Sequence, residues 1–263
     1  MSCYLLRSTI VSTSASLASW LRRCHLRSLD ARRIGYWLAT MLLIGILSLQ
    51  AQTSSPDLAP SQQKSQVFVT TGASFPVDVL VKSPADTDAE LQVICLFQSD
   101  PANSLRGSLL EIDQKLGGLL TLLRKDSLFA GYLGETLLIT PRSGAIPAHR
   151  LFIIGLGDLE SFTPNREQLI GTIVFQESSR LGVAHPFFAP TVLDGGKTGM
   201  DTGETAEQFV RGFLRAKAVD DLLQSKGVLS DSAPIRLTFL AGAEHAQSTR
   251  SGIARVLATA PSQ

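Results

Sequence analysis

Short apolar runs, many of them β-branched, recur along the chain after residue 66, with polar stretches between them. Several runs are continuously apolar rather than alternating, which is typical of strands that are covered on both faces of a sheet. We expect strands at residues 67–71, 77–81, 91–97, 136–140, 151–154 and 235–240, and a weaker one around residues 187–193.

Helical patterns lie between these runs. Residues 105–123 place apolar side chains three and four positions apart, which forms one apolar stripe. Thr163 followed by Pro164 is a helix start signal, with Thr163 as the N-cap, and two more helices are expected over about residues 205–224 and after Gly242. The inward-facing residues predicted in chain order are Leu109, Ile112, Leu116, Leu119, Leu120, Leu123, Leu169, Ile170, Ile173, Val174, Phe209, Val210, Phe213, Leu214, Leu222, Ile253, Val256 and Leu257.

The alternation of strands and helices predicts a three-layer α/β/α fold with a mostly parallel or mixed sheet. Hydrophobic residues make up 44% of the chain and charged residues 18%, which describes a globular protein. This composition excludes disordered, collagen-like and polytopic membrane chains.

The charge is unevenly distributed along the 263 residues, although the net charge is only +1. Residues 1–51 hold six arginines and one aspartate, a net of +5, so the remainder has 18 bases and 22 acids, a net of −4. We therefore expect a targeting leader at residues 1–51, a polar flexible linker at 52–65 and one domain at 66–258. The scattered bases of an acidic domain predict no nucleic-acid partner.

Residues 34–49 form an uncharged apolar run after Arg32 and Arg33 that resembles a secretory signal, with cleavage expected after Ala51. The run is shorter than the ~20 residues of a comfortable span, so a cleaved signal is favoured over a membrane anchor. We expect an exported protein in the periplasm, the envelope or the extracellular space, which contacts a membrane only if the run is uncleaved. An organelle-targeting peptide and a start codon assigned too early are alternatives for the first 31 residues.

Cys95 is the one cysteine beyond the leader, so no internal disulfide is expected in the domain. It lies inside an apolar run, which predicts a buried small hydrophobic residue rather than a nucleophile.

The segment Gly155, Leu156, Gly157 and Asp158 follows the predicted strand at 151–154. Glycines let a backbone turn sharply and approach a ligand, and α/β sheets bind ligands at the carboxyl ends of strands. There is no third glycine at dinucleotide spacing, so a structural turn is favoured over a nucleotide cradle. These four residues are the candidate ligand-binding residues.

Residues 194–199 (Asp-Gly-Gly-Lys-Thr-Gly) superficially resemble a phosphate-binding loop. Thr191 stands where that motif needs glycine, and a flexible acidic stretch follows instead of an apolar helix. A surface loop is therefore predicted.

No motif for metal, cofactor or nucleophilic chemistry is found. The domain's three histidines, His149, His185 and His245, are isolated, and there is no His-Glu-x-x-His or Gly-x-Ser-x-Gly sequence. Asp220 and Asp221 are adjacent on a predicted helix and point about 100° apart, so a solvated face is favoured. We predict no catalytic residues, metal or cofactor.

The order of four segments resembles the N-terminal domain of the leucyl (cytosol) aminopeptidases. These segments are Phe75–Val81, Asp113–Leu120, Phe129–Glu135 and Leu151–Gly157, within a resemblance that covers roughly residues 75–225. The most specific motif is the Phe129–Glu135 turn together with Ile154–Gly157, although Tyr132 stands where the family often has lysine. The resemblance implies a macro-domain-like α/β/α fold.

In that family the two-metal site and the catalytic lysine and arginine belong to a separate C-terminal domain marked by Asn-Thr-Asp-Ala-Glu-Gly-Arg. This stretch does not occur here. The resemblance therefore implies that the chain by itself does not hydrolyse peptides.

Three functions remain open. The leading hypothesis is a non-catalytic exported domain that binds a protein partner, itself or a small ligand. The second is a regulatory or accessory part of a metalloaminopeptidase whose catalytic domain lies on another chain. Binding of ADP-ribose or another nucleotide, near Gly155–Gly157 and residues 194–199, is placed lowest.

Overall fold

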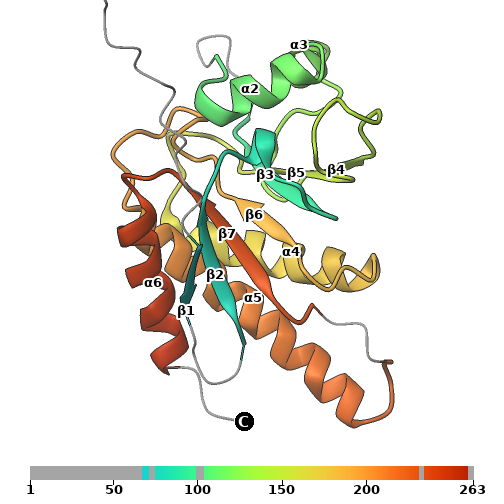
Figure 1. The fold of residues 1–263 in the computed structure, drawn as a ribbon, viewed down its shortest axis with the longest axis vertical. Coiled ribbons are helices and arrows are strands. Elements are labelled where there is room, and N and C mark those ends of the chain that lie inside the picture. Colours follow the sequence, from blue (N-terminus) through green and yellow to red (C-terminus); the bar gives the residue numbers. More distant parts are fainter. Residues whose placement is uncertain (1–66, 71–74, 99–103, 231–233, 260–263) are drawn as a thin grey trace, which may run out of the picture. The chain divides into compact units, whose positions relative to one another are not determined.

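The computed structural model describes residues 67–70, 75–98, 104–230 and 234–259 (Figure 1). The predicted leader, its apolar run and the linker lie outside these residues. No helix within the described residues has both the length and the apolar character that crossing a bilayer requires.

Seven strands of the described chain form one mixed sheet in the order β1-β2-β7-β6-β3-β5-β4. The pairs β2–β7, β7–β6, β6–β3 and β3–β5 are parallel, whereas β1 and β4 pair antiparallel at the two edges. In chain order the strands are β1 (Val67–Thr70), β2 (Val77–Val81), β3 (Gln92–Leu96), β4 (Thr136–Ile139), β5 (Leu151–Gly155), β6 (Phe187–Ala189) and β7 (Leu237–Ala241). Strands are therefore found at all seven predicted places, and the sheet is mixed.

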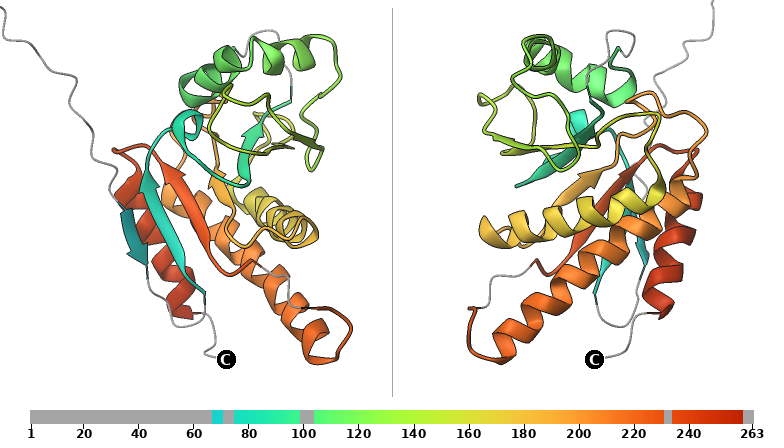
Figure 2. Two further views of the ribbon diagram at one scale, coloured as in Figure 1. Left: turned by 45° about the vertical axis from the view of Figure 1, so that its right-hand side comes forward. Right: turned by 180° about the vertical axis from the view of Figure 1, so that it is seen from behind.

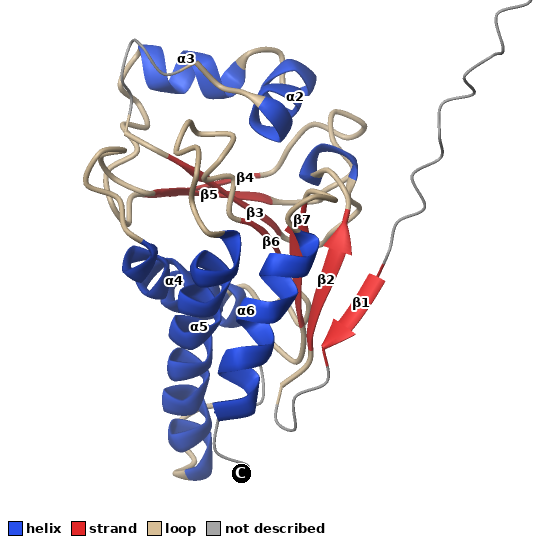
Figure 3. Cartoon of the chain, turned by 90° about the vertical axis from the view of Figure 1, so that its left-hand side faces the viewer, coloured by secondary structure: helices blue, strands red, loops and turns tan. Residues whose placement is uncertain are grey.

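Helices cover both faces of this sheet, which confirms the three-layer architecture (Figures 2 and 3). Helices α4 (Glu167–Arg180), α5 (Thr202–Ser225) and α6 (Ala246–Thr259) pack on one face. Helices α2 (Gly107–Lys115) and α3 (Leu119–Lys125) pack on the other.

Strands β3 and β5 are buried at every residue, because the sheet carries a helical layer on each face. Along β3, Val93 and Cys95 belong to the core cluster of α4, α5 and α6, whereas Ile94 and Leu96 belong to the cluster of α2 and α3. A strand in this position gains by being apolar at every residue, which explains the continuous runs. Cys95 is fully buried, as predicted.

The stripe predicted over residues 105–123 is two helices rather than one. Gly117 and Gly118 lie between α2 and α3 with φ of +69° and +83°. A left-handed glycine ends an α-helix because it redirects the chain while its backbone still bonds to the last turn. The apolar spacing continues across the break, which is why the periodicity alone did not show it.

The other helices lie close to their predicted places, with two wrong assignments of inward-facing residues. Thr163 is at an N-cap, but of a short 3₁₀ turn (Pro164–Arg166) that precedes α4, and its side chain makes no capping hydrogen bond. Leu169 is 42% exposed and Leu222 is 57% exposed, so both side chains lie at the surface of α4 and α5. The predicted inward residues of α6 are all buried.

Candidate functional site

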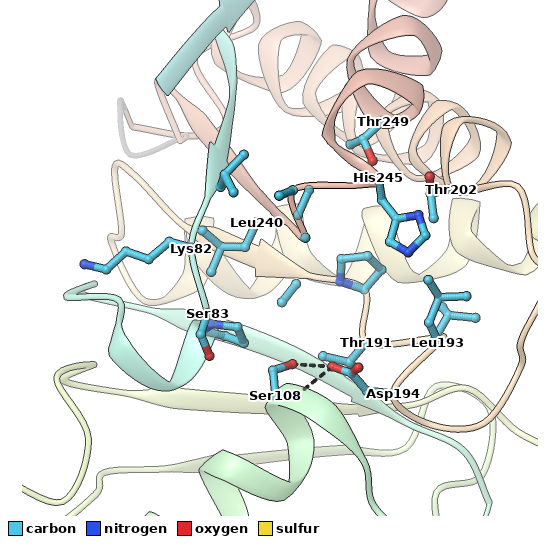
Figure 4. Close-up of a pocket in the computed structure, with 18 of the residues that line it drawn as sticks. Lys82, Ser83, Ser108, Thr191, Leu193, Asp194, Thr202, Leu240, His245 and Thr249 are labelled. Carbon is cyan, nitrogen blue, oxygen red and sulfur yellow. Dashed lines mark hydrogen bonds between the residues drawn. The ribbon is translucent and has the colours of Figure 1, made fainter. Parts of the chain in front are cut away.

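A pocket of about 750 Å³ lies at the carboxyl ends of β2, β7 and β6 (Figure 4). Its walls come from the segments that follow these strands, at residues 81–84, 189–194 and 240–245, and from the first turns of α2, α5 and α6. The carboxyl edge of a parallel sheet is the usual place for a ligand in an α/β fold, because loops diverge there and leave a crevice.

Thr191 fixes the wall that follows β6. Its Oγ1 donates to the carbonyl of Cys95 at 2.7 Å and accepts from the Cys95 amide at 2.9 Å. These two bonds attach the segment to β3 beyond the last paired residue of β6, where Pro190 has no amide to donate. The loop that carries Asp194 therefore starts from a fixed point.

The side chain of Asp194 caps the N-terminus of α2. Its Oδ2 accepts from the backbone amide of Ser108 at 3.1 Å and also from the Ser108 hydroxyl. A Cβ on Gly107, where φ is +47°, would lie 2.2 Å from Asp194 Oδ1, so only glycine fits beside this carboxylate. Burial raises the pKa of Asp194, and the nearby Glu111 raises it further, while the Ser108 bonds oppose both effects.

Asp201 is the N-cap residue of α5, and its side chain also accepts hydrogen bonds from backbone amides of the first turn. Its Oδ1 accepts from the amides of Gly203 at 2.8 Å and Glu204 at 3.3 Å and from the Ser248 hydroxyl at 3.1 Å. The bond from the Gly203 amide is the main reason why the pKa of Asp201 is lowered. The free amides of a helix N-terminus bind anions, so the protein's own carboxylates occupy this place on both α2 and α5.

Thr249 places a hydroxyl on the opposite wall. The residue is only 3% exposed, and its hydroxyl, turned toward the pocket, has no hydrogen bond to another described residue (Figure 4). The imidazole of His245 and the hydroxyl of Thr202 lie on the same side. Thr249 Oγ1 is not among the buried side-chain atoms that lack a partner, so it is open to the pocket and available to hydrogen-bond to a ligand.

The lining is acidic. Its carboxylates are Asp86, Glu111, Asp194 and Glu244, and its one lysine is Lys82. Figure 4 shows the Lys82 side chain extending away from the other labelled residues.

The candidate residues Gly155, Leu156, Gly157 and Asp158 lie elsewhere, at the end of β5, and do not line this pocket. The turn at residues 129–135 is packed against them. Gly157 N donates to Gly131 O at 2.9 Å, and Gly134 N donates to Gly155 O at 2.9 Å. A Cβ on Gly155 would lie 2.0 Å from the carbonyl oxygen of Tyr132, so the glycine accommodates a neighbouring backbone. Ligand binding at these four residues stays a prediction.

Residues 194–199 are more than the expected surface loop, because Asp194 is half-buried and caps α2. Nothing local in the sequence shows this role, since Ser108 is 86 positions away. A signal for the pocket did exist: the strands predicted at 77–81, 187–193 and 235–240 end within or next to the segments that line it, and the carboxyl ends of parallel strands share one edge.

No group of three or more His, Cys, Asp or Glu side chains among the described residues could hold a metal ion. His185 Nε2 lies 2.7 Å from the Thr238 hydroxyl, and His149 lies 4.0 Å from Asp88. Burial, and secondarily Glu167, raises the pKa of the Cys95 thiol well above its ordinary value, as in a structural cysteine.

Comparisons with known proteins agree with this architecture. The sequence profile described as "Cytosol aminopeptidase family, N-terminal domain" matches residues 93–227. A mutant macrodomain of Oceanobacillus iheyensis superposes with a TM-score of 0.50 at 13% identity, over 74% of this chain and 100% of that chain. The macrodomain of the same organism with MES bound gives a TM-score of 0.50 at 11% identity, over 74% and 100%.

A tomato leucine aminopeptidase mutant gives a TM-score of 0.49 at 14% identity, over 72% of this chain and 37% of that chain. No curated protein sequence matches the chain. At these identities the two macrodomain superpositions show a common fold.

Proposed function

The chain belongs to the cytosol aminopeptidase family through its N-terminal domain, and from this premise we propose that it is a non-catalytic domain that binds a small ligand. The binding site is the pocket at the carboxyl ends of β2, β7 and β6.

The pocket itself carries this proposal. Its volume of about 750 Å³ suits a small molecule, since such sites usually measure ~300–1,000 Å³. Its lining combines apolar surface with a few convergent polar groups, among them the hydroxyl of Thr249, which faces the pocket. Apolar surface supplies affinity at such a site, and the polar groups orient the ligand.

Absence of peptidase activity is part of this proposal, and the chemistry of the described side chains supports it. Two-metal hydrolysis needs several carboxylates around a pair of ions, and the described residues offer no such group. The Asn-Thr-Asp-Ala-Glu-Gly-Arg stretch that marks the family's catalytic domain is also missing from the sequence.

We expect the purified full chain to release no leucine from leucyl amide in the presence of Zn²⁺ or Mn²⁺. An active aminopeptidase of the same family, assayed in parallel, is the positive control. Metal-dependent release that a chelator abolishes would overturn the non-catalytic assignment.

Ligand binding is tested by saturation-transfer NMR of the full chain against fragments that include cationic, neutral and anionic molecules. Leu193→Trp fills part of the pocket, and Leu222→Trp adds the same side chain on the exposed face of α5. Fragments should bind the unmodified chain and Leu222→Trp but not Leu193→Trp. If no fragment binds, or if Leu193→Trp binds equally well, the pocket is not the ligand site.

An accessory role beside a separate catalytic chain is the second candidate, and membership of the family is what favours it. Co-purification of the chain with an aminopeptidase would support this role. Nucleotide binding remains the least favoured, because Asp194 and Asp201 already occupy the helix N-termini at the pocket edge.

A further inference from the structure

We propose that the ligand of this pocket is a small organic cation, with a primary ammonium or guanidinium group on an apolar body. The inference rests on the proposed function and specifies the chemical class of its ligand.

Two carboxylates of the lining form no ion pair with a base of the described residues. Glu111 accepts a hydrogen bond from the Ser83 hydroxyl at 2.6 Å, and Asp194 accepts from Ser108. Both donors are uncharged, so neither carboxylate is neutralised. Asp86 differs, because Lys115 Nζ lies 2.5 Å from its Oδ1.

These two carboxylates act on one another. They reach the pocket from different segments, Glu111 from α2 and Asp194 from the loop after β6. Their interaction contributes to the raised pKa of Asp194. A cation placed between two like charges relieves their repulsion and gains attraction from both.

The lining bases do not cancel this charge. The ammonium group of Lys82 extends away from the pocket, and His245 Nε2 lies 4.0 Å from Glu244. The pocket therefore presents net negative charge, which attracts cations and repels anions.

The backbone amides at the start of α2 and α5 do not offer an anion site either. Asp194 accepts from the Ser108 amide of α2, and Asp201 accepts from the Gly203 amide of α5. These two helix N-termini, where phosphate commonly binds, are thus engaged within the protein.

The cation is organic rather than a metal ion. The described residues contain no cluster of three metal-ligating side chains, whereas apolar surface from Ala189, Pro190 and Leu240 lies in the same pocket. An ammonium group on an apolar chain satisfies both parts of this lining. The hydroxyl of Thr249, which has no hydrogen bond to another described residue, faces this space and remains for a polar group of the ligand.

A matched series of probes tests the charge preference: n-pentylammonium, 1-pentanol and pentanoate, titrated into the full chain near neutral pH. Pentylammonium should bind at least ~10-fold more tightly than pentanol, and pentanoate should not bind measurably. Raising the salt concentration should weaken binding of pentylammonium and leave that of pentanol unchanged.

Glu111→Gln should weaken binding of pentylammonium by ~10-fold and leave that of pentanol within twofold. Asp220→Asn, which lies on α5 outside the lining of this pocket, changes the net charge equally and should have an effect below twofold. Glu111→Asp keeps the charge and should retain most of the affinity. Thermal unfolding checks that each variant is folded. The salt titration uses the unmodified chain, so it tests the charge preference even if a variant fails to fold.

Pentanol or pentanoate binding as tightly as pentylammonium, and lost in Leu193→Trp, would overturn the cationic class while leaving the ligand-binding function intact. Failure of all three probes and of the whole fragment set would overturn the function and the class together.

Discussion

Glu167 is a carboxyl group at the first position of α4 that is completely buried. Neither of its side-chain oxygens has a hydrogen-bond partner within the described part of the chain. Burial without a partner disfavours the charged form, which raises the pKa of Glu167 from its ordinary 4.5 to about 8. The folded protein therefore holds a proton here that the unfolded chain releases at neutral pH.

This proton makes the stability of the protein depend on pH. Between about pH 4.5 and 8 the folded state binds more protons than the unfolded state, so the free energy of unfolding decreases as pH rises. The contribution of the Glu167 proton to the free energy of unfolding is complete below the pKa of the unfolded chain and is lost by about pH 8. Its total is up to roughly 5 kcal/mol.

Glu167→Gln removes this titration and should flatten the decrease in stability between about pH 5 and pH 8.5. Urea unfolding at several pH values measures it. Glu160→Gln, at an exposed loop position, should keep the slope of the unmodified protein. Equal slopes for the unmodified protein and Glu167→Gln would show that Glu167 titrates normally.

Helices α4 and α5 pack so closely that their backbones meet. A Cβ on Gly171 of α4 would lie 2.1 Å from the carbonyl oxygen of Phe209, and one on Gly212 of α5 would lie 2.0 Å from that of Gln168. The hydroxyl of Thr172 spans the same contact, with its Oγ1 3.0 Å from Gln168 O and 3.3 Å from Gly212 O. Both glycines are therefore required by packing between the helices.

Gly212→Ala should destabilise the protein by about 1–3 kcal/mol, because the helices must separate. The sign is informative, since replacing glycine by alanine inside a helix normally stabilises by roughly 0.5–1 kcal/mol. Chemical denaturation measures the change. Arg215→Ala, at an exposed position of the same helix, should stay within about 0.5 kcal/mol. Stabilisation by Gly212→Ala would contradict the close packing.

At the scale of the whole molecule, the described residues hold the sheet and its helices, and the arginine-rich leader with its apolar run lies outside them. Export stays a proposal that rests on the uneven charge and the apolar run of the sequence.

Residues 1–65 fused ahead of alkaline phosphatase should export the enzyme from a bacterium in active form. Leu43→Arg interrupts the apolar run with a charge and should abolish this export. Gel mobility reports cleavage after Ala51, and an uncleaved product in the membrane fraction would establish the anchor instead. Activity that survives Leu43→Arg would contradict a secretory signal.

The sequence by itself determined the positions of the strands, the burial of Cys95, the layered architecture and the resemblance to the family. These properties are local or periodic. A strand covered on both faces must be apolar throughout, and a helix that faces a core must repeat its apolar residues every three or four positions.

Only the tertiary structure decided the site. The three strands that form the pocket are neighbours in the sheet, although they are far apart in the chain, and the order of strands is not encoded in any of them. The contact of Asp194 with Ser108 depends on that order, as does the exposure of Leu169 and Leu222, which is set by what covers each helix. The periodicity of the sequence predicts which face of a helix or strand is apolar. Packing between elements that are distant in the sequence decides which residues that face contacts.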